Sequence, residues 1–251
     1  MSSATKMLFR KSWLESRGRF IAASVVLAIL GVSTVLRAPA TIVGWESIHR
    51  GEQMSYPLYI WLSLSHGFLQ FLWVVAAVIL GLGGLIREEA LGSVGFSLAL
   101  PVSRRAHVFA RAGVGAVEAI ALGFIPGLIV VALSPMIGRS YPLSQAVMFA
   151  AMLVLAGLVF YALGFSLSHI LRGEYGAPAV AMAAIAAFYV LTKLPRLEFL
   201  NVFDAMDGKQ VLVGHTFYLG SEFPIAVTVA SLAVAAGFVA LSVVRVQRYD
   251  F

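Results

Sequence analysis

Residues 87–111, REEALGSVGFSLALPVSRRAHVFAR, separate two apolar stretches that are each long enough to cross a bilayer. The segment begins with acidic side chains, which suit the positive end of a helix dipole, and it ends with arginines. Between them Leu91, Val94 and Leu98 recur at a spacing that places them on one face of a helix. Pro101 disfavours helix at the residue before it. The sequence therefore predicts a short amphipathic helix between two membrane spans.

The composition of the whole chain indicates a lipid environment. Of its 251 residues, 60% are hydrophobic and 12% are charged, with a mean hydropathy of +0.91. A soluble domain keeps roughly a quarter of its residues charged. The absence of cysteine excludes a disulfide framework and a cysteine-ligated zinc site. In a membrane protein the net charge of +6 reports orientation and anionic headgroups, so no nucleic-acid partner is expected.

Six stretches of the chain are candidates for membrane spans, because a helix needs about 20 apolar residues to cross. Backbone amides in lipid must be satisfied within their own segment, so each span is predicted to be helical. The expected fold is all-α, a single transmembrane domain over residues 1–251. Its predicted spans lie at about 20–36, 61–86, 106–133, 143–169, 177–194 and 223–244.

Basic residues are unequally divided between the two sides of these six spans. With both termini in the cytoplasm, twelve Lys and Arg residues fall on the inner side and six on the outer side, as the general excess of cytoplasmic positive charge predicts. The absence of an N-x-[ST] sequence favours a bacterial protein, and so a bacterial cytoplasmic membrane. The inner residues are Lys6, Arg10, Lys11, Arg17, Arg19, Arg87, Arg104, Arg105, Arg111, Arg172, Arg245 and Arg248, and the outer residues are Arg37, Arg50, Arg139, Lys193, Arg196 and Lys209.

The start of the chain permits more than one interpretation. Residues 6–20, KMLFRKSWLESRGRF, intersperse apolar and basic side chains, which predicts an amphipathic helix in the inner headgroup layer. A frayed basic tail is the alternative. Residues 20–40 also resemble the apolar region and A-x-A-like site of a signal peptide. The long preceding region, Arg37 and Pro39 argue against cleavage, so this stretch is expected to remain as the first span.

Sequence motifs of enzymes and pumps are incomplete in this chain. The pattern G-x-x-x-x-G-K-[ST] is absent, since Gly208-Lys209 is followed by Gln210, and we expect no ATP hydrolysis by this chain alone. Residues 204–208, DAMDG, match the first half of the metal-binding motif of CDP-alcohol phosphatidyltransferases, but the second aspartate pair is missing. The five histidines show no paired-ligand spacing. No catalytic, cofactor or metal site is therefore predicted.

Glu118 lies in the third predicted span among Ala, Gly and Val residues. Carboxylates within membranes are costly and usually face a cavity or a partner, which favours a role in a transport path or in its gating. The alternatives are a hydrated position near the inner interface and a structural pair with an arginine.

The order of residues in 87–111 resembles the cytoplasmic loop of type-2 ABC transporter permeases, the membrane subunits of export-type transporters. That loop has an acid-rich start, then Gly-Thr, a Leu-rich turn, Pro-x-Ser-Arg and a later basic residue. Ser93 stands here where threonine is commoner, and Arg111 where lysine is commoner. The residues that carry the resemblance are Glu88, Glu89, Gly92, Ser93, Leu98, Leu100, Pro101, Val102, Ser103, Arg104 and Arg111.

The resemblance implies the permease subunit of an ABC exporter and not an enzyme. Such a subunit pairs with a second permease, identical or homologous, and docks on a separate ATPase subunit that binds ATP and Mg²⁺. The helix at 87–100 would be the coupling helix that contacts the ATPase. Its implied contact residues are Glu88, Glu89, Leu91, Gly92, Val94 and Leu98, while Pro101, Arg104 and Arg105 would position the loop at the headgroups.

Two other classes of protein remain open on the residues alone. A lipid-modifying membrane enzyme would need a catalytic cluster of acids, histidines or serine, which the predicted spans do not offer. A secondary transporter or channel would be expected to show inverted repeats or more charges within its spans. The resemblance does not indicate a substrate.

Overall fold

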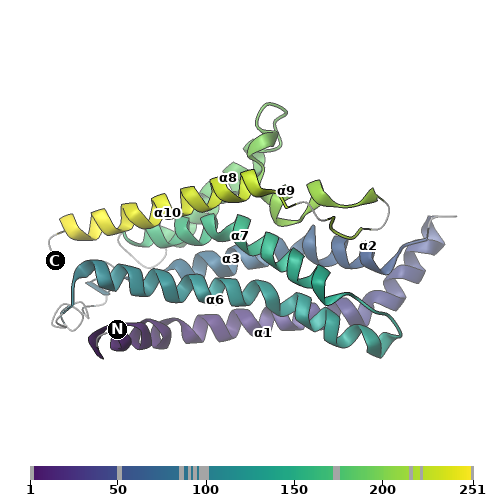
Figure 1. The fold of residues 1–251 in the computed structure, drawn as a ribbon, viewed down its shortest axis with the longest axis horizontal. Helices are drawn as coiled ribbons and strands as arrows, with labels where there is room; N and C mark the ends of the chain where they lie inside the picture. The colour runs from purple at the N-terminus through teal and green to yellow at the C-terminus, as the bar shows by residue number, and fades with distance from the viewer. Residues whose placement is uncertain are drawn as a thin grey trace.

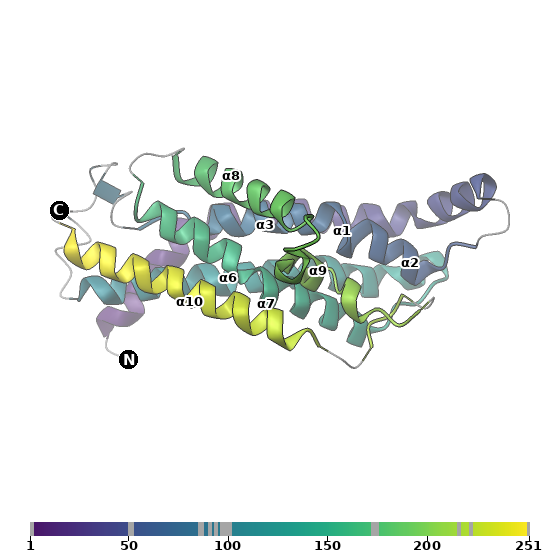
Figure 2. The same ribbon diagram turned by 90° about the horizontal axis from the view of Figure 1, so that it is seen from above.

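The computed structural model describes residues 3–49, 53–84, 88–89, 92, 95, 102–171, 176–214, 217–220 and 223–249. Over these residues the chain is helical and forms no strand, with one isolated bridge between Leu212 and Leu219. The long helices lie side by side along the longest axis of the molecule (Figures 1 and 2). The start of α1 and the end of α10 lie at the same end of this bundle, which we call the terminal end (Figure 1).

Five helical segments are long and apolar enough to cross a membrane, which is compatible with a multi-pass membrane protein and confirms the all-α prediction. They contain α1 (Ser3–Ile48), α3 (Phe68–Gly81), α6 (Arg104–Leu133), α7 (Leu143–Ser168) and α10 (Ile225–Arg248). The predicted fifth span contains α8, Gly176–Leu191, which has only 16 residues. At about 1.5 Å per residue it is shorter than a hydrocarbon core of about 30 Å. Length and composition therefore support five spans among the described residues.

The start of the chain differs from its prediction, because the expected interfacial helix and the expected first span form one continuous helix. In α1 the residues Leu8, Ser12 and Ser16 are buried at intervals of four, so this part of the helix packs on the bundle. The helix also runs past residue 36, through Pro39, to Ile48. Much of the loop expected at 37–60 is thus helical, since Val35, Ala38 and Ile42 continue the buried stripe.

The second predicted span is interrupted. The short helix α2 (Tyr56–Ile60) leads into a π-helical turn, Trp61–Ser65, and α3 begins only at Phe68. The His66 amide donates to the carbonyl of Trp61 at 2.8 Å, which closes a five-residue π turn. Such turns are frequent at functional sites, and this one places His66 outside the regular helix.

The connection between α8 and α10 folds back on the bundle. It contains η3 (Glu198–Leu200), α9 (Val202–Met206) and η4 (Lys209–Val211). Helix α9 packs against α7 and α10. Between α8 and α9 the chain protrudes from the bundle (Figure 1).

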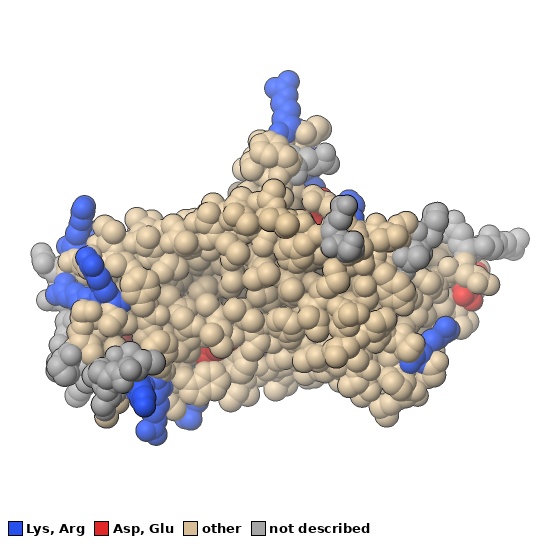
Figure 3. Space-filling model, viewed as in Figure 1, with Lys and Arg blue, Asp and Glu red and all other residues tan. Residues whose placement is uncertain are grey.

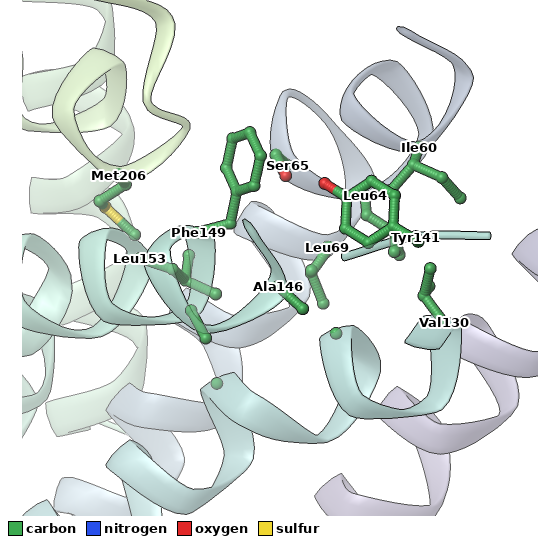
Figure 4. A pocket seen from close by; sticks show the side chains of 13 residues that line it. Ile60, Leu64, Ser65, Leu69, Val130, Tyr141, Ala146, Phe149, Leu153 and Met206 are labelled. Atoms are coloured by element: carbon green, nitrogen blue, oxygen red, sulfur yellow. The ribbon is translucent and has the colours of Figure 1, made fainter. Parts of the chain in front are cut away.

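The interior of the bundle is tightly packed. Trp73 of α3 is fully buried, and its indole nitrogen donates to the carbonyl of Ala119 in α6 at 3.0 Å. A cavity between α3, α6 and α7, lined by Leu69, Val130 and Tyr141 among others, has a volume of only about 30 Å³ (Figure 4). A cavity of that size holds one or two waters, so it offers no path for a larger solute.

We expect the close approach of α3 and α7 to be sensitive to one added methyl group. A Cβ at Gly164 would lie 2.9 Å from the Val78 carbonyl oxygen, so Gly164→Ala forces the backbones apart and costs about 1–3 kcal/mol. The matched variant Gly237→Ala meets nothing within 4 Å and should be neutral or stabilising. Thermal unfolding of both variants in detergent, followed by size-exclusion chromatography, measures the difference. Equal midpoints would contradict the packing described here.

Candidate functional site

The segment that follows α3 is held by arginines from two other helices. Leu82 already has an extended backbone. Its carbonyl accepts hydrogen bonds from Arg19 Nη1 of α1 at 2.6 Å and from Arg111 Nη2 of α6 at 2.8 Å. Arg19 also donates to the Ile79 carbonyl at 2.9 Å. The last carbonyls of a helix have no partner within it, and here two guanidinium groups supply the donors.

Two glycines let the chain pass between these side chains. Gly83 and Gly84 have φ angles of 144° and 106°, a conformation that other residues rarely adopt. A Cβ at Gly83 would lie 2.8 Å from Arg111 Nε, and a Cβ at Gly84 would lie 2.3 Å from His169 Nε2. The hydroxyl of Ser168, at the end of α7, lies 2.9 Å from the Gly83 carbonyl oxygen. Four helices therefore meet at this segment.

Arg111 connects α1, α3 and α6. Its side chain is buried at 4% exposure, and its second terminal nitrogen donates to the Ser12 carbonyl of α1 at 2.9 Å. A buried charge is tolerated only where it is paired or hydrogen-bonded. The carbonyls of Ser12 and Leu82 meet this requirement for the two terminal nitrogens, while Nε has no hydrogen-bond partner among the described residues. Arg111, the basic residue at the end of the 87–111 pattern that resembles the permease loop, thus links three helices.

Glu118 lies two turns further along α6 and is buried at 2% exposure. Its Oε1 accepts a hydrogen bond of 2.5 Å from the Ser16 hydroxyl of α1, and Oε2 has no hydrogen-bond partner among the described residues. The carboxylate therefore faces α1, and it lines none of the cavities described in this article. Its predicted role in a path or gate stays a prediction, and its contact is with a serine rather than an arginine.

The two acidic residues predicted to dock an ATPase contact their own chain. Glu88 Oε1 pairs with Lys11 Nζ of α1 at 2.9 Å, and the Glu88 amide donates to the Gly84 carbonyl at 3.0 Å. Glu89 Oε2 accepts a hydrogen bond of 2.8 Å from the hydroxyl of Tyr249, directly after α10. These contacts extend the attachment of the segment to α1 and to the end of α10.

The other predicted docking residues are only partly within the described chain. Gly92 is exposed, with a φ of 72°. Leu91, Val94, Leu98 and Pro101 lie outside the described residues. The predicted coupling helix therefore stays a prediction.

Arg104 and Arg105 contact the end of α10, and their predicted position at the headgroups stays a prediction. Arg104 Nη1 donates to the carbonyl of Tyr249 at 2.7 Å, and Arg105 Nη2 donates to the Gln247 side chain at 3.3 Å. Ser103 caps α6, since its hydroxyl accepts from the Ala106 amide at 3.2 Å. We call the whole set of interacting residues the loop anchor: Lys11, Ser12, Arg19, Leu82, Gly83, Gly84, Glu88, Glu89, Arg104, Arg111, Ser168 and Tyr249.

The sequence interpretation missed several members of the loop anchor. Lys11 and Arg19 were counted only as basic residues that set orientation, and Tyr249 was not considered. The glycine pair after an apolar stretch was the available signal for a tight passage. The acceptors of Arg19 are backbone carbonyls, which no sequence pattern specifies, and the partners of Lys11 and Tyr249 are the carboxylates of Glu88 and Glu89, which are distant in sequence.

Charged residues gather at the ends of the bundle. Figure 3 shows Lys and Arg residues at the terminal end. The middle of the same face, below the protrusion that precedes α9, is covered almost entirely by uncharged residues. No group of three or more His, Asp or Glu side chains that could hold a metal ion occurs within the described residues. The contacts of the loop anchor join helices to one another.

No protein-family model matches the chain, and no curated protein is significantly similar to it in sequence. A function for this chain is therefore inferred from the loop anchor and from the resemblance of residues 87–111.

We expect loss of the Arg111 guanidinium to destabilise the bundle. Arg111→Met removes the donors to the carbonyls of Ser12 and Leu82, at a cost of about 3 kcal/mol for hydrogen bonds that involve a charge. Arg105→Met removes one exposed contact and should cost less than about 0.5 kcal/mol. Detergent-solubilised thermal unfolding compares the two variants. An Arg111 variant as stable as the Arg105 variant would show that the bridge contributes nothing to the fold.

Proposed function

We propose that this chain is the permease subunit of an ABC exporter, which pairs with a second permease and couples movement of a substrate to ATP hydrolysis by a separate subunit. The observation that carries this proposal is the loop anchor. The chain devotes the buried guanidinium of Arg111, two glycines and the cap formed by Ser103 to the connection between α3 and α6. A connection with no further task would not need such attachments.

The mechanism follows from which helices the loop anchor joins. A displacement applied at residues 87–100 would pass to α3 through Leu82 and Gly83, to α1 through Lys11 and Ser12, and to α10 through Tyr249. Packed cores shift between discrete arrangements rather than deforming continuously. An attachment to several helices therefore favours movement of the bundle as a body.

Because Glu88 and Glu89 contact their own chain, we assign them to attachment of the coupling helix and not to docking on the ATPase. Their carboxylates would hold the first turn of the coupling helix against α1 and α10. The apolar residues Leu91, Val94 and Leu98 would then provide the surface that enters the ATPase. The coupling helix would thus be attached to the bundle by polar residues and would dock on the ATPase through apolar residues.

Co-purification of this chain with an ABC-type ATPase from its native membranes tests the proposal. We expect wild-type chain to retain the ATPase, and Leu91→Asp/Leu98→Asp to lose it, because carboxylates cannot enter an apolar cleft without a large desolvation cost. A matched control is Ile48→Asp/Met136→Asp, which changes two exposed apolar residues at the opposite end of the bundle. Retention by the control with loss by the first variant supports the assignment. Absence of any ATPase from the wild-type preparation would refute the exporter.

Single cysteines test orientation and the sixth span, since the natural chain contains none. We expect Met136→Cys and Arg196→Cys to react with an impermeant maleimide in intact cells, and Arg10→Cys and Gln247→Cys to react only after permeabilisation. All four positions are exposed. Reaction of the Arg196→Cys variant only after permeabilisation would show that α8 does not cross, and the six-span arrangement would then be wrong.

A further inference from the structure

A small cavity lies beside the loop anchor and is lined in part by its residues. The lining residues come from α1, from α6 and from the chain that directly follows α3 and α7. The volume of this cavity is about 20 Å³, and a cavity needs about 10–15 Å³ to hold a water. By size it therefore takes one water molecule and no larger solute.

Two buried nitrogen atoms of the lining side chains have no hydrogen-bond partner among the described residues. One is Nε of Arg111, a residue that is 4% exposed, and the other is Nε2 of His169, which is 1% exposed. Buried polar groups in folded proteins almost always have a partner, either another protein group or an ordered water. Because both side chains line the same cavity, one occupant can serve both nitrogens.

The other charged groups of the lining are engaged with one another. Lys11 Nζ lies 2.9 Å from Glu88 Oε1 and 3.4 Å from Glu15 Oε1. Lys11 and Arg111 together carry as much charge as Glu15 and Glu88. The charged side chains around the cavity therefore select neither an anion nor a cation, and a neutral occupant is favoured.

The two nitrogens differ in hydrogen-bond chemistry. Arg111 Nε carries a hydrogen and can only donate. His169 Nδ1 lies 2.8 Å from the Phe165 carbonyl oxygen, and a carbonyl only accepts, so Nδ1 carries the hydrogen of the neutral ring and Nε2 is an acceptor. Burial of the ring and the guanidinium in the same cavity wall both disfavour a second proton on the histidine. The two nitrogens thus present one donor and one acceptor.

We propose that this cavity binds one ordered water, which accepts a hydrogen bond from Arg111 Nε and donates one to His169 Nε2. A molecule that both donates and accepts, that is uncharged and that fits the volume meets all three conditions. The water would connect the guanidinium of the loop anchor in α6 with the histidine at the end of α7. Its binding requires neither an ATPase nor a second permease, so it stands apart from the proposed function.

An experimental structure of the full chain, at a resolution that shows ordered water, tests the site directly. We expect one density peak within hydrogen-bond distance of Arg111 Nε and His169 Nε2. A cavity without density would overturn the proposal. Crystals grown in bromide distinguish a halide from water, because bromide scatters anomalously. An anomalous peak at this position would show a halide and would overturn the water.

Matched variants on α6 test the site in solution. Val108 lines this cavity, and Val130 lines the cavity of Figure 4, whose lining includes none of the buried atoms without partners. Val108→Ile should displace the water and leave a donor and an acceptor unpaired, which lowers the midpoint of thermal unfolding by about 2–4 °C. Val130→Ile adds the same methylene group and should leave the midpoint unchanged or raise it. A loss by Val108→Ile no greater than that by Val130→Ile would overturn the proposal.

A second substitution separates displacement of water from simple overpacking. His169→Phe keeps an aromatic ring but removes the acceptor, so the water should already be lost in this variant. In that background Val108→Ile should no longer lower the midpoint, since effects on residues that share a partner are not additive. An unchanged loss would show that the added methylene is merely too large, and would overturn the water. The density and the two valine variants decide the matter if the His169 variant does not fold.

Discussion

The buried guanidinium of Arg111 sets the strictest condition on this bundle. A charge removed from both water and lipid must have hydrogen-bond acceptors, and Arg111 finds them in the carbonyls of Ser12 and Leu82. The Leu82 carbonyl is free because α3 ends there, and it is within reach because Gly83 and Gly84 let the chain turn away. The end of α3, the depth of α1 and the position of α6 are therefore mutually dependent.

The rest of the fold follows from apolar packing, and it could be foreseen in outline. Composition and hydropathy predicted an all-helical membrane protein, and the positions of α6, α7 and α10 agree with the expected spans within a few residues. Continuation of α1 past Arg37 was missed because a charge and a proline suggested an end. Tertiary packing of Ala38 and Ile42 overrides both signals, since propensity is only a weak local preference.

The functional features were harder to foresee for a different physical reason. Glu118 was noticed because ionisable groups are rare in apolar segments, and Arg111 was noticed as the late basic residue of the family resemblance. Their partners are backbone carbonyls and a serine hydroxyl, which have no distinctive spacing. His66 and Asp207 are 141 residues apart, and the aspartate was considered only as part of an incomplete metal motif. The contact between His66 and Asp207 arises only because the fold brings the π turn at Trp61–Ser65 next to α9.

The segment between α3 and α6 and helix α8 are attached to the bundle in different ways. At the terminal end, charged and polar groups from α1, α3, α6, α7 and α10 join one short segment, so few relative movements are available there. Helix α8, which lies in the half of the bundle nearer the terminal end (Figure 2), is attached by a stripe of three buried side chains between two grooves, and removing it from the bundle breaks few contacts. Regions with few buried contacts open at lower free energy than the core. If a displacement were applied at the loop anchor, the helices joined there would therefore move together relative to α8.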